Sequence, residues 1–245
     1  MSGLVLFERD GAIATLTLNR PDKRNALNLA LWGELAAHLD TIEAVGEEIA
    51  AVVLRSNGAV FCAGNDLKER GVPAPSRFYQ AKLITRLADL AQPVIVAVQG
   101  GCFTGGLELA LAGDIIVAGE SASFADTHGK FALVPAWGMS QRLPRRVGQW
   151  KAREISLTGL PVSGAEAARI GLANHCVPDA QLDAKVRELA EAIAAQSRHS
   201  VFAYKKLYCE QADLPLAAGL AHEVFNGAGV GPDFADRVAG RFGKI

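Results

Sequence analysis

The sequence predicts an α/β fold whose strands pair largely in parallel. Short apolar runs rich in β-branched residues alternate with segments of helical periodicity as far as residue 180 or so. The last fifty residues contain no strand signal and are expected to be helical. The 245 residues include no low-complexity linker and no exact internal repeat.

The first third of the chain is expected to form a hairpin, a buried strand and two helices. The dipeptide Asp10–Gly11 between two apolar stretches is a strong hairpin signal. Apolar residues recur at helical spacing in the first helix, at Leu31, Leu35, Leu39 and Ile42. The second helix is expected to turn three side chains inward, those of Phe78, Leu83 and Leu87. The expected strands are residues 4–7, 12–19 and 49–54, and the expected helices are 28–45 and 76–90.

Residues 93–112 are expected to run as strand, glycine turn and helix. The run 93–98 is short, apolar and closed by glycines, and good helix formers follow at 107–112 until Gly113 ends them. The turn leaves free backbone N–H groups at the positive end of a helix, which suits an anion or a developing oxyanion. Glu108 lies in the first turn of this apolar helix. It is either a functional carboxylate or a partner of the helix dipole.

Beyond Gly113 the sequence predicts two short strands and then helices. Ser163–Glu166 fits a capping box that begins a helix, and Gly171 ends it. A long Ala-rich helix carries an apolar face made of Leu182, Val186, Leu189 and Ile193. The strands expected here are residues 114–118 and 123–124, and the long helix is expected at 179–196.

Composition and charge exclude several classes of function. Half of the residues are hydrophobic, a fifth are charged and the net charge is −1, so neither a nucleic-acid footprint nor a membrane-surface patch is expected. No apolar run approaches the roughly 20 residues of a membrane span, and no signal peptide is evident. The four cysteines are widely spaced and include no Cys-x-x-Cys pair. This spacing indicates reduced thiols in a cytoplasmic protein, and neither a disulfide framework nor a metal site is expected.

Four motifs stand in order along the chain. They are the loop 19–28 (NRPDKRNALN), the segment 61–68 (FCAGNDLK), the turn and helix start 105–110 (GGLELA), and the run that begins at Pro135 and includes 141–144 (QRLP). At this spacing they resemble the signatures of the crotonase superfamily, whose best-known members are the enoyl-CoA hydratases. The resemblance covers almost the whole chain.

The resemblance implies a particular fold and assembly. A crotonase-like spiral of ββα turns is expected over residues 1–195, and a helical C-terminal region over 196–245 that builds a homotrimer or, from two trimers, a homohexamer. The apolar residues of this region exceed what one small core needs, and such patches usually mark subunit contacts. The set is Val201, Phe202, Tyr204, Leu207, Leu214, Leu216, Leu220, Val224 and Phe225.

The resemblance also implies acyl-CoA chemistry. An acyl-CoA thioester reacts through an enolate-like state with negative charge on its carbonyl oxygen, and preorganised N–H donors facing that oxygen are often the largest single catalytic contribution. By motif position the donors are the backbone N–H groups of Asn65 and Gly105. Glu108 matches one catalytic glutamate of the family.

The same resemblance places the coenzyme A part of the substrate. Lys23 and Arg24 are cations suited to its phosphates. Backbone groups of four further residues are expected against its pantetheine and adenine, namely Ala26, Ala63, Asp66 and Leu67. Coenzyme A is then part of the substrate, and no separate cofactor is expected.

The chain departs from the family at the second catalytic acid. A hydratase of this kind has a second glutamate seven residues before the proline that is here Pro135, and that position holds His128. The imidazole either takes the place of this acid, since its ordinary pKa of about 6.5 suits proton transfer near neutrality, or only lines the pocket, oriented by Asp126. Trp137 is bulkier than the small residue usual at its position, and either narrows the acyl pocket or belongs to the core.

The expected function is therefore that of an enoyl-CoA hydratase-like enzyme, which adds or removes water across the double bond of a 2-enoyl-CoA. The alternatives are another crotonase reaction (double-bond isomerisation, decarboxylation or thioester hydrolysis) and an acyl-CoA-binding homologue with weak catalysis. Isomerisation is disfavoured, because isomerases of the family usually keep an acid at the position of His128.

Overall fold

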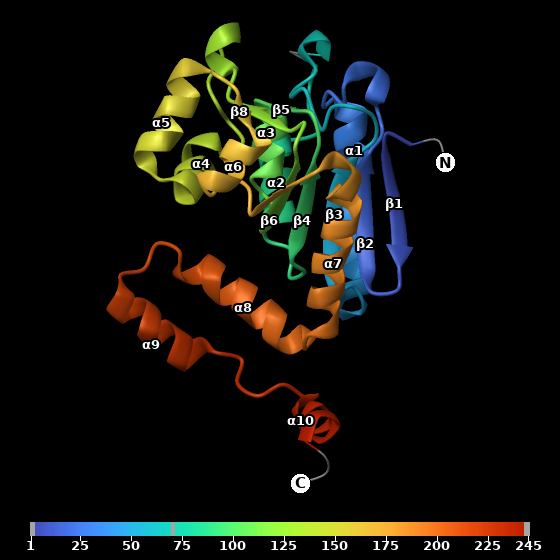
Figure 1. The fold of residues 1–245 in the computed structure, drawn as a ribbon, viewed down its shortest axis with the longest axis vertical. Helices are drawn as coiled ribbons and strands as arrows, with labels where there is room; N and C mark the ends of the chain where they lie inside the picture. Colours follow the sequence, from blue (N-terminus) through green and yellow to red (C-terminus); the bar gives the residue numbers. More distant parts are fainter. Residues whose placement is uncertain (1–2, 70–71, 243–245) are drawn as a thin grey trace.

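A computed structural model describes residues 3–69 and 72–242 (Figure 1). Its centre is a six-stranded sheet in the order β1-β2-β3-β4-β6-β9, in which only the β1–β2 pair is antiparallel. The largely parallel pairing agrees with the prediction. The strands are β1 Val5–Asp10, β2 Ile13–Leu18, β3 Ala51–Ser56, β4 Val94–Val98, β6 Ile115–Gly119 and β9 His175–Val177.

A second, three-stranded sheet has the order β5-β7-β8. Its strands are β5 Gly101–Phe103, β7 Ser123–Ala125 and β8 Val162–Ser163. The predicted glycine turn after β4 thus contains a short strand, which pairs in parallel with β7. Strands β8 and β9 were not predicted, because strands of two or three residues are too short for a periodic pattern.

The described part of the chain contains ten α-helices. They are α1 Leu29–Val45, α2 Tyr79–Ala88, α3 Gly105–Ala110, α4 Met139–Val147, α5 Gln149–Thr158, α6 Gly164–Arg169, α7 Leu182–Ala195, α8 Arg198–Gln211, α9 Leu216–Asn226 and α10 Phe234–Phe242. Short 3₁₀ turns also occur, and three of them carry predicted site residues: Pro21–Lys23, Leu67–Glu69 and His128–Phe131.

The two faces of the central sheet bury different helices. On one face, α1 inserts the predicted apolar residues, all fully buried, into the main core. The opposite face packs against α7, whose residues Leu182 and Val186 join a smaller cluster with Val53, Ile95 and Val117. The apolar faces predicted for both helices are therefore confirmed. In Figure 1, α7 is the orange helix drawn in front of the sheet.

One expectation for the helices was wrong, and two helices were missed. Phe78 does not face inward: it precedes α2 with a left-handed φ of 61°, and its side chain is 61% exposed. Helices α4 and α5 were not predicted. Each buries only two side chains, so neither presents an apolar stripe long enough to read.

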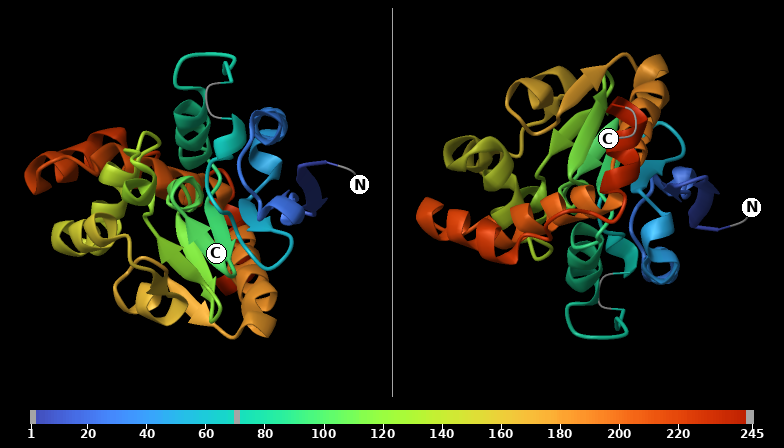
Figure 2. Two further views of the ribbon diagram at one scale, coloured as in Figure 1. Left: turned by 90° about the horizontal axis from the view of Figure 1, so that it is seen from above. Right: turned by 90° about the horizontal axis from the view of Figure 1, so that it is seen from below.

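The C-terminal helices reach away from the sheets (Figures 1 and 2). One buried contact ties α8 to the core: Lys205 Nζ lies 2.7 Å from Asp114 Oδ2 and donates to the carbonyl oxygen of Gln92 at 2.9 Å. Large apolar side chains stay exposed on this arm. They are Tyr204, Tyr208, Leu214, Leu216, Leu220, Val224, Phe225, Val230 and Phe234.

None of the described helices is long and apolar enough to cross a membrane.

Candidate active site

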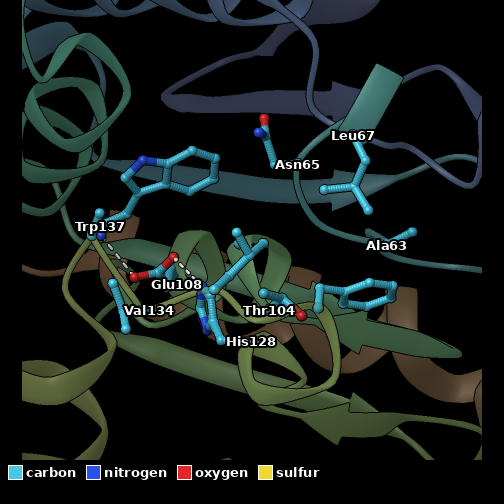
Figure 3. A pocket seen from close by; sticks show the side chains of 12 residues that line it. Ala63, Asn65, Leu67, Thr104, Glu108, His128, Val134 and Trp137 are labelled. Carbon is cyan, nitrogen blue, oxygen red and sulfur yellow. Dashed lines mark hydrogen bonds and ion pairs between the residues drawn. The ribbon is translucent and has the colours of Figure 1, made fainter. Parts of the chain in front are cut away.

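A cavity of about 220 Å³ lies where four segments of the chain meet (Figure 3). These segments are the loop before residue 68, the start of α3, the 3₁₀ turn His128–Phe131 and the loop that leads into α4. The predicted site residues that line it are Ala63, Asn65, Leu67, Gly105, Glu108, His128 and Trp137. Thr104, Phe131, Leu133, Val134 and Ala136 complete the lining.

Backbone pairing brings two of the sequence motifs together. Cys62 N donates to Gly101 O and Phe103 N donates back to Cys62 O, both at 3.0 Å, so the 61–68 segment lies along β5. Gly64 has a φ of +99°, and a Cβ added there would lie 3.0 Å from Phe103 O and 3.4 Å from Gly105 N. Glycine is therefore required at 64 for both its conformation and this close approach.

The same pairing sets two backbone donors beside each other. A Cβ placed on Gly105 would lie 3.4 Å from the backbone N of Asn65. Within the described residues, neither the Asn65 N–H nor the Gly105 N–H donates to a protein acceptor. Gly105 is also the first residue of α3, where the helix dipole is positive. The two groups are thus available to an oxygen that gains negative charge.

Thr104 holds the start of α3 in an unusual backbone conformation that the sequence did not signal. Its φ is 53° and its ψ is −113°, outside the common regions for a residue with a Cβ. Its N–H donates to Ala125 O at 2.9 Å, and its hydroxyl is hydrogen-bonded to that of Thr127. These two contacts, both to the end of β7 and the residues just after it, hold the strained turn that aims the Gly105 N–H.

Glu108 is buried, and backbone donors hold one of its two carboxylate oxygens. Its Oε1 accepts from Trp137 N at 2.8 Å and from Met139 N at 3.2 Å, while its Oε2 lies 3.6 Å from His128 Nε2. Burial raises the pKa of this carboxyl, although the two backbone hydrogen bonds lower it in part. A buried acid with a raised pKa and one free oxygen is typical of a proton-transfer group.

His128 is oriented by a second buried carboxylate. Its Nδ1 lies 2.6 Å from Asp126 Oδ1, which also accepts from the His128 backbone N–H at 3.2 Å. Burial acts to raise the pKa of Asp126, but hydrogen bonds from His128 and Ser156 outweigh it and hold that pKa below its ordinary value. The ionised Asp126 can only accept, so Nδ1 carries a proton and Nε2 faces Glu108.

Only some of the residues predicted to contact the CoA moiety line the cavity. The side chains of Lys23 and Arg24 are exposed, and neither residue lines the cavity, nor do Ala26 and Asp66. The loop that carries Lys23, Arg24 and Ala26 lies beside the cavity, since Leu27 N donates to Gly64 O at 2.8 Å, and Asp66 lies between the lining residues Asn65 and Leu67.

Arg20 was missed by the sequence reasoning. Its Nη1 bonds Asp66 Oδ2 at 2.7 Å and the carbonyl oxygen of Ala26 at 3.0 Å. The hydrogen bond from Arg20 lowers the pKa of the Asp66 carboxyl, although desolvation partly opposes it. Arg20 therefore ties the first motif loop to the second.

The described residues include no group of three or more His, Cys, Asp or Glu side chains placed to hold a metal ion. The four cysteines are free thiols.

Comparison with known proteins identifies this arrangement. The family model described as enoyl-CoA hydratase/isomerase matches residues 8–227. The chain is 35% identical over 218 residues to a probable peroxisomal enoyl-CoA hydratase of Arabidopsis thaliana. The matched region covers 88% of this chain and 82% of the relative.

Solved structures show the same fold. An enoyl-CoA hydratase from Bacillus anthracis superposes with a TM-score of 0.91 at 32% identity, covering 98% of this chain and 97% of that one. A putative enoyl-CoA hydratase from Thermobifida fusca, in complex with acetoacetyl-CoA, gives a TM-score of 0.81 at 30% identity, covering 91% and 92%. These likenesses confirm the predicted crotonase-like α/β fold.

Proposed function

The chain belongs to the enoyl-CoA hydratase/isomerase family, and we propose that it hydrates the double bond of a 2-enoyl-CoA thioester with Glu108 and His128 as its acid–base pair. That it is an enzyme of the enoyl-CoA hydratase type follows from its relatives. The observation that carries the proposal is the 3.6 Å approach of Glu108 Oε2 to His128 Nε2, in a cavity that also presents the backbone N–H groups of Asn65 and Gly105, which donate to no acceptor in the described part of the chain.

Each step is assigned to a group of this cavity. The thioester oxygen accepts from the N–H groups of Asn65 and Gly105, and a water lies against both Glu108 Oε2 and His128 Nε2. Glu108 removes a proton from the water as its oxygen bonds to the β carbon, and the displaced electron pair moves onto the thioester oxygen as an enolate. The enolate collapses as the protonated His128 delivers its proton to the α carbon.

The ionised Asp126 stabilises the imidazolium before that transfer. A proton passing from Glu108 to His128 then resets the pair. In this scheme His128 does the work of the second glutamate that the chain lacks.

Replacement of His128 tests the assignment. His128→Ala is expected to lower hydration of crotonyl-CoA about 10²-fold or more, the usual contribution of a general acid. His128→Glu restores a second carboxylate beside Glu108, and two carboxylates that share a site raise one pKa, so this variant is expected to keep more activity than His128→Ala. The measurement is the initial rate of hydration with saturating substrate.

His38→Gln is the matched control, because His38 does not line the cavity: its Nε2 is hydrogen-bonded to the Val5 carbonyl and its ring stacks on that of Phe7. It should leave the rate unchanged. Strong hydration by the wild type that His128→Ala does not reduce would show that another group supplies the proton, and the role given to His128 would be wrong.

The substrate is an acyl-CoA. We propose that the phosphates of the CoA moiety lie against Lys23 and Arg24, and that backbone groups of Ala26, Ala63, Asp66 and Leu67 contact its pantetheine and adenine. The support is the position of these residues on loops beside the cavity and the acetoacetyl-CoA held by the Thermobifida fusca relative. Coenzyme A enters as part of the substrate, and the proposed steps draw on no further cofactor.

We also propose an assembly. Residues 1–195 form the catalytic core, and the exposed apolar side chains of residues 196–245 bind other copies of the chain in a homotrimer or homohexamer. Side chains such as Leu216 and Phe225, at 80% and 84% exposure, support this proposal. Light scattering at micromolar concentration is expected to give three or six times the chain mass; a monomer would contradict it.

We propose that the protein works in a reducing compartment such as the cytoplasm, because its four cysteines are free thiols.

A further inference from the structure

The indole of Trp137 forms a wall against the two backbone donors. A Cβ added to Gly105 would lie 2.4 Å from Trp137 Cζ3 and 3.0 Å from Cε3, so the six-membered ring rests directly on the Gly105 backbone. The same Cβ position is 3.4 Å from Asn65 N. Figure 3 shows the ring over Glu108, extending toward Asn65. A thioester oxygen bound by the two N–H groups therefore brings its carbonyl carbon and the next atoms of the acyl group close to this ring.

The position of Trp137 is fixed by a contact of its ring with Trp32 and by hydrogen bonds of its backbone. The ring of Trp32, fully buried on α1, meets the Trp137 ring edge to face, with centroids 5.4 Å apart and an interplanar angle of 82°. The backbone N–H of Trp137 donates to Glu108 Oε1 at 2.8 Å, and the backbone carbonyl oxygen of Trp137 accepts from Arg142 Nη1 at 2.9 Å. A swing of the indole toward the core would collide with Trp32, so the ring does not withdraw to admit a longer chain.

The cavity is also small and almost uncharged. Its volume of about 220 Å³ is below the roughly 300–1,000 Å³ of a site for a drug-sized ligand. Apart from the proposed acid–base pair, Glu108 and His128, the described residues that line it carry no charged side chain. Near Trp137 the lining is apolar, with Leu133, Val134 and Ala136.

We infer that Trp137 is a specificity-determining residue that limits the length of the acyl group, and that the substrates are short-chain 2-enoyl-CoA thioesters with a hydrocarbon acyl group, such as crotonyl-CoA. This inference rests on the proposed function for the position of the thioester. Once the carbonyl is at the two N–H groups and the double bond is at Glu108 and His128, the indole blocks the continuation of the chain on that side. The absence of a further charged lining residue disfavours acyl groups that end in a carboxylate.

The test separates binding from turnover. Saturated butanoyl-, octanoyl- and dodecanoyl-CoA are titrated calorimetrically into the wild type and into Trp137→Ala, and hydration is measured with the matching enoyl-CoA esters. The wild type is expected to bind butanoyl-CoA at least as tightly as octanoyl-CoA. In Trp137→Ala the octanoyl to butanoyl affinity ratio should rise by about tenfold or more, since each newly buried methylene contributes up to about fourfold.

Trp137→Phe and Trp150→Ala make the result interpretable. Phenylalanine keeps an aromatic contact with Trp32 but is smaller, so this variant should shift the ratio in the same direction by less, even if Trp137→Ala fails to fold. Trp150 is 79% exposed on α5 and does not line the cavity, so Trp150→Ala should not change the ratio.

Two outcomes overturn the inference: a wild type that binds dodecanoyl-CoA as tightly as butanoyl-CoA, or folded Trp137 variants that leave the ratio unchanged. If the binding preference shifts as expected but no ester is hydrated, the limit on acyl length stands and the proposed hydration fails.

Discussion

Glu108→Gln is expected to reduce the hydration of crotonyl-CoA by about 10²- to 10⁴-fold without preventing CoA-ester binding. Glutamine keeps the shape of the side chain, and its Oε1 still accepts from the Trp137 and Met139 N–H groups that hold Glu108 now. What it loses is the free carboxylate oxygen that faces His128. The measurements are the hydration rate and the calorimetric affinity for butanoyl-CoA.

The same variant is expected to be more stable than the wild type at neutral pH. Burial raises the pKa of Glu108 above its ordinary 4.5, so the stability that its protonated form contributes is present below about pH 4.5 and is lost as pH rises through the folded-state pKa. At pH 7 the wild type must bury a carboxylate, whereas glutamine is neutral at every pH. Thermal unfolding should therefore give a higher melting temperature for the variant at pH 7, and the gain should shrink as pH approaches 4.

This pair of readouts distinguishes a catalytic acid from a structural one. A carboxylate that served only the dipole of α3 would stabilise the protein, and its loss would lower the melting temperature while leaving hydration intact. Glu166 offers the comparison: it also lies in the first turn of a helix, α6, but pairs with Arg169 at the surface. Glu166→Gln should leave the rate unchanged and should not raise the melting temperature.

Removal of the Gly105 N–H is expected to lower kcat about 10²- to 10³-fold, the effect of losing one oxyanion-hole donor. Gly105→Pro deletes this donor at the first position of α3, where proline is compatible with a helix. Any side chain at 105 also collides with Trp137, whose Cζ3 would lie 2.4 Å from the new Cβ. The test is therefore made in the Trp137→Ala background, which removes the collision.

In that background Gly105→Ala keeps the N–H and is expected to retain most of the parent activity, whereas Gly105→Pro is expected to lose it. Single-turnover rates with saturating crotonyl-CoA measure the difference, and circular dichroism checks that both variants are folded. Equal rates for the alanine and proline variants would show that the Gly105 N–H does not bind the reacting oxygen.

Much of the fold was predictable because local signals were strong. Helix α1 and strand β4 carry uninterrupted apolar patterns, and the glycine next to Asp10 marks the first hairpin, with a φ of +58° at Gly11. By contrast, α4, α5, β8 and β9 are short or polar and gain their structure from packing against neighbours. Phe78 was predicted to face inward because it falls at helical spacing with Leu83 and Leu87. In the structure α2 begins only at Tyr79, so Phe78 lies before the helix and does not share its buried face.

The sequence alone determined the family, and the type and order of its motifs predicted most of the residues that line the cavity. It left the roles of His128 and Trp137 open. The sequence already offered Asp126, two positions away, as the group that orients His128, but only the tertiary structure placed His128 Nε2 3.6 Å from Glu108 Oε2. Only the tertiary structure pressed the Trp137 ring onto Gly105, with Trp32 behind it. These contacts join residues from 20 positions apart (Glu108 and His128) to 105 positions apart (Trp32 and Trp137). The distance and orientation of two side chains across such a separation depend on packing that no local pattern encodes.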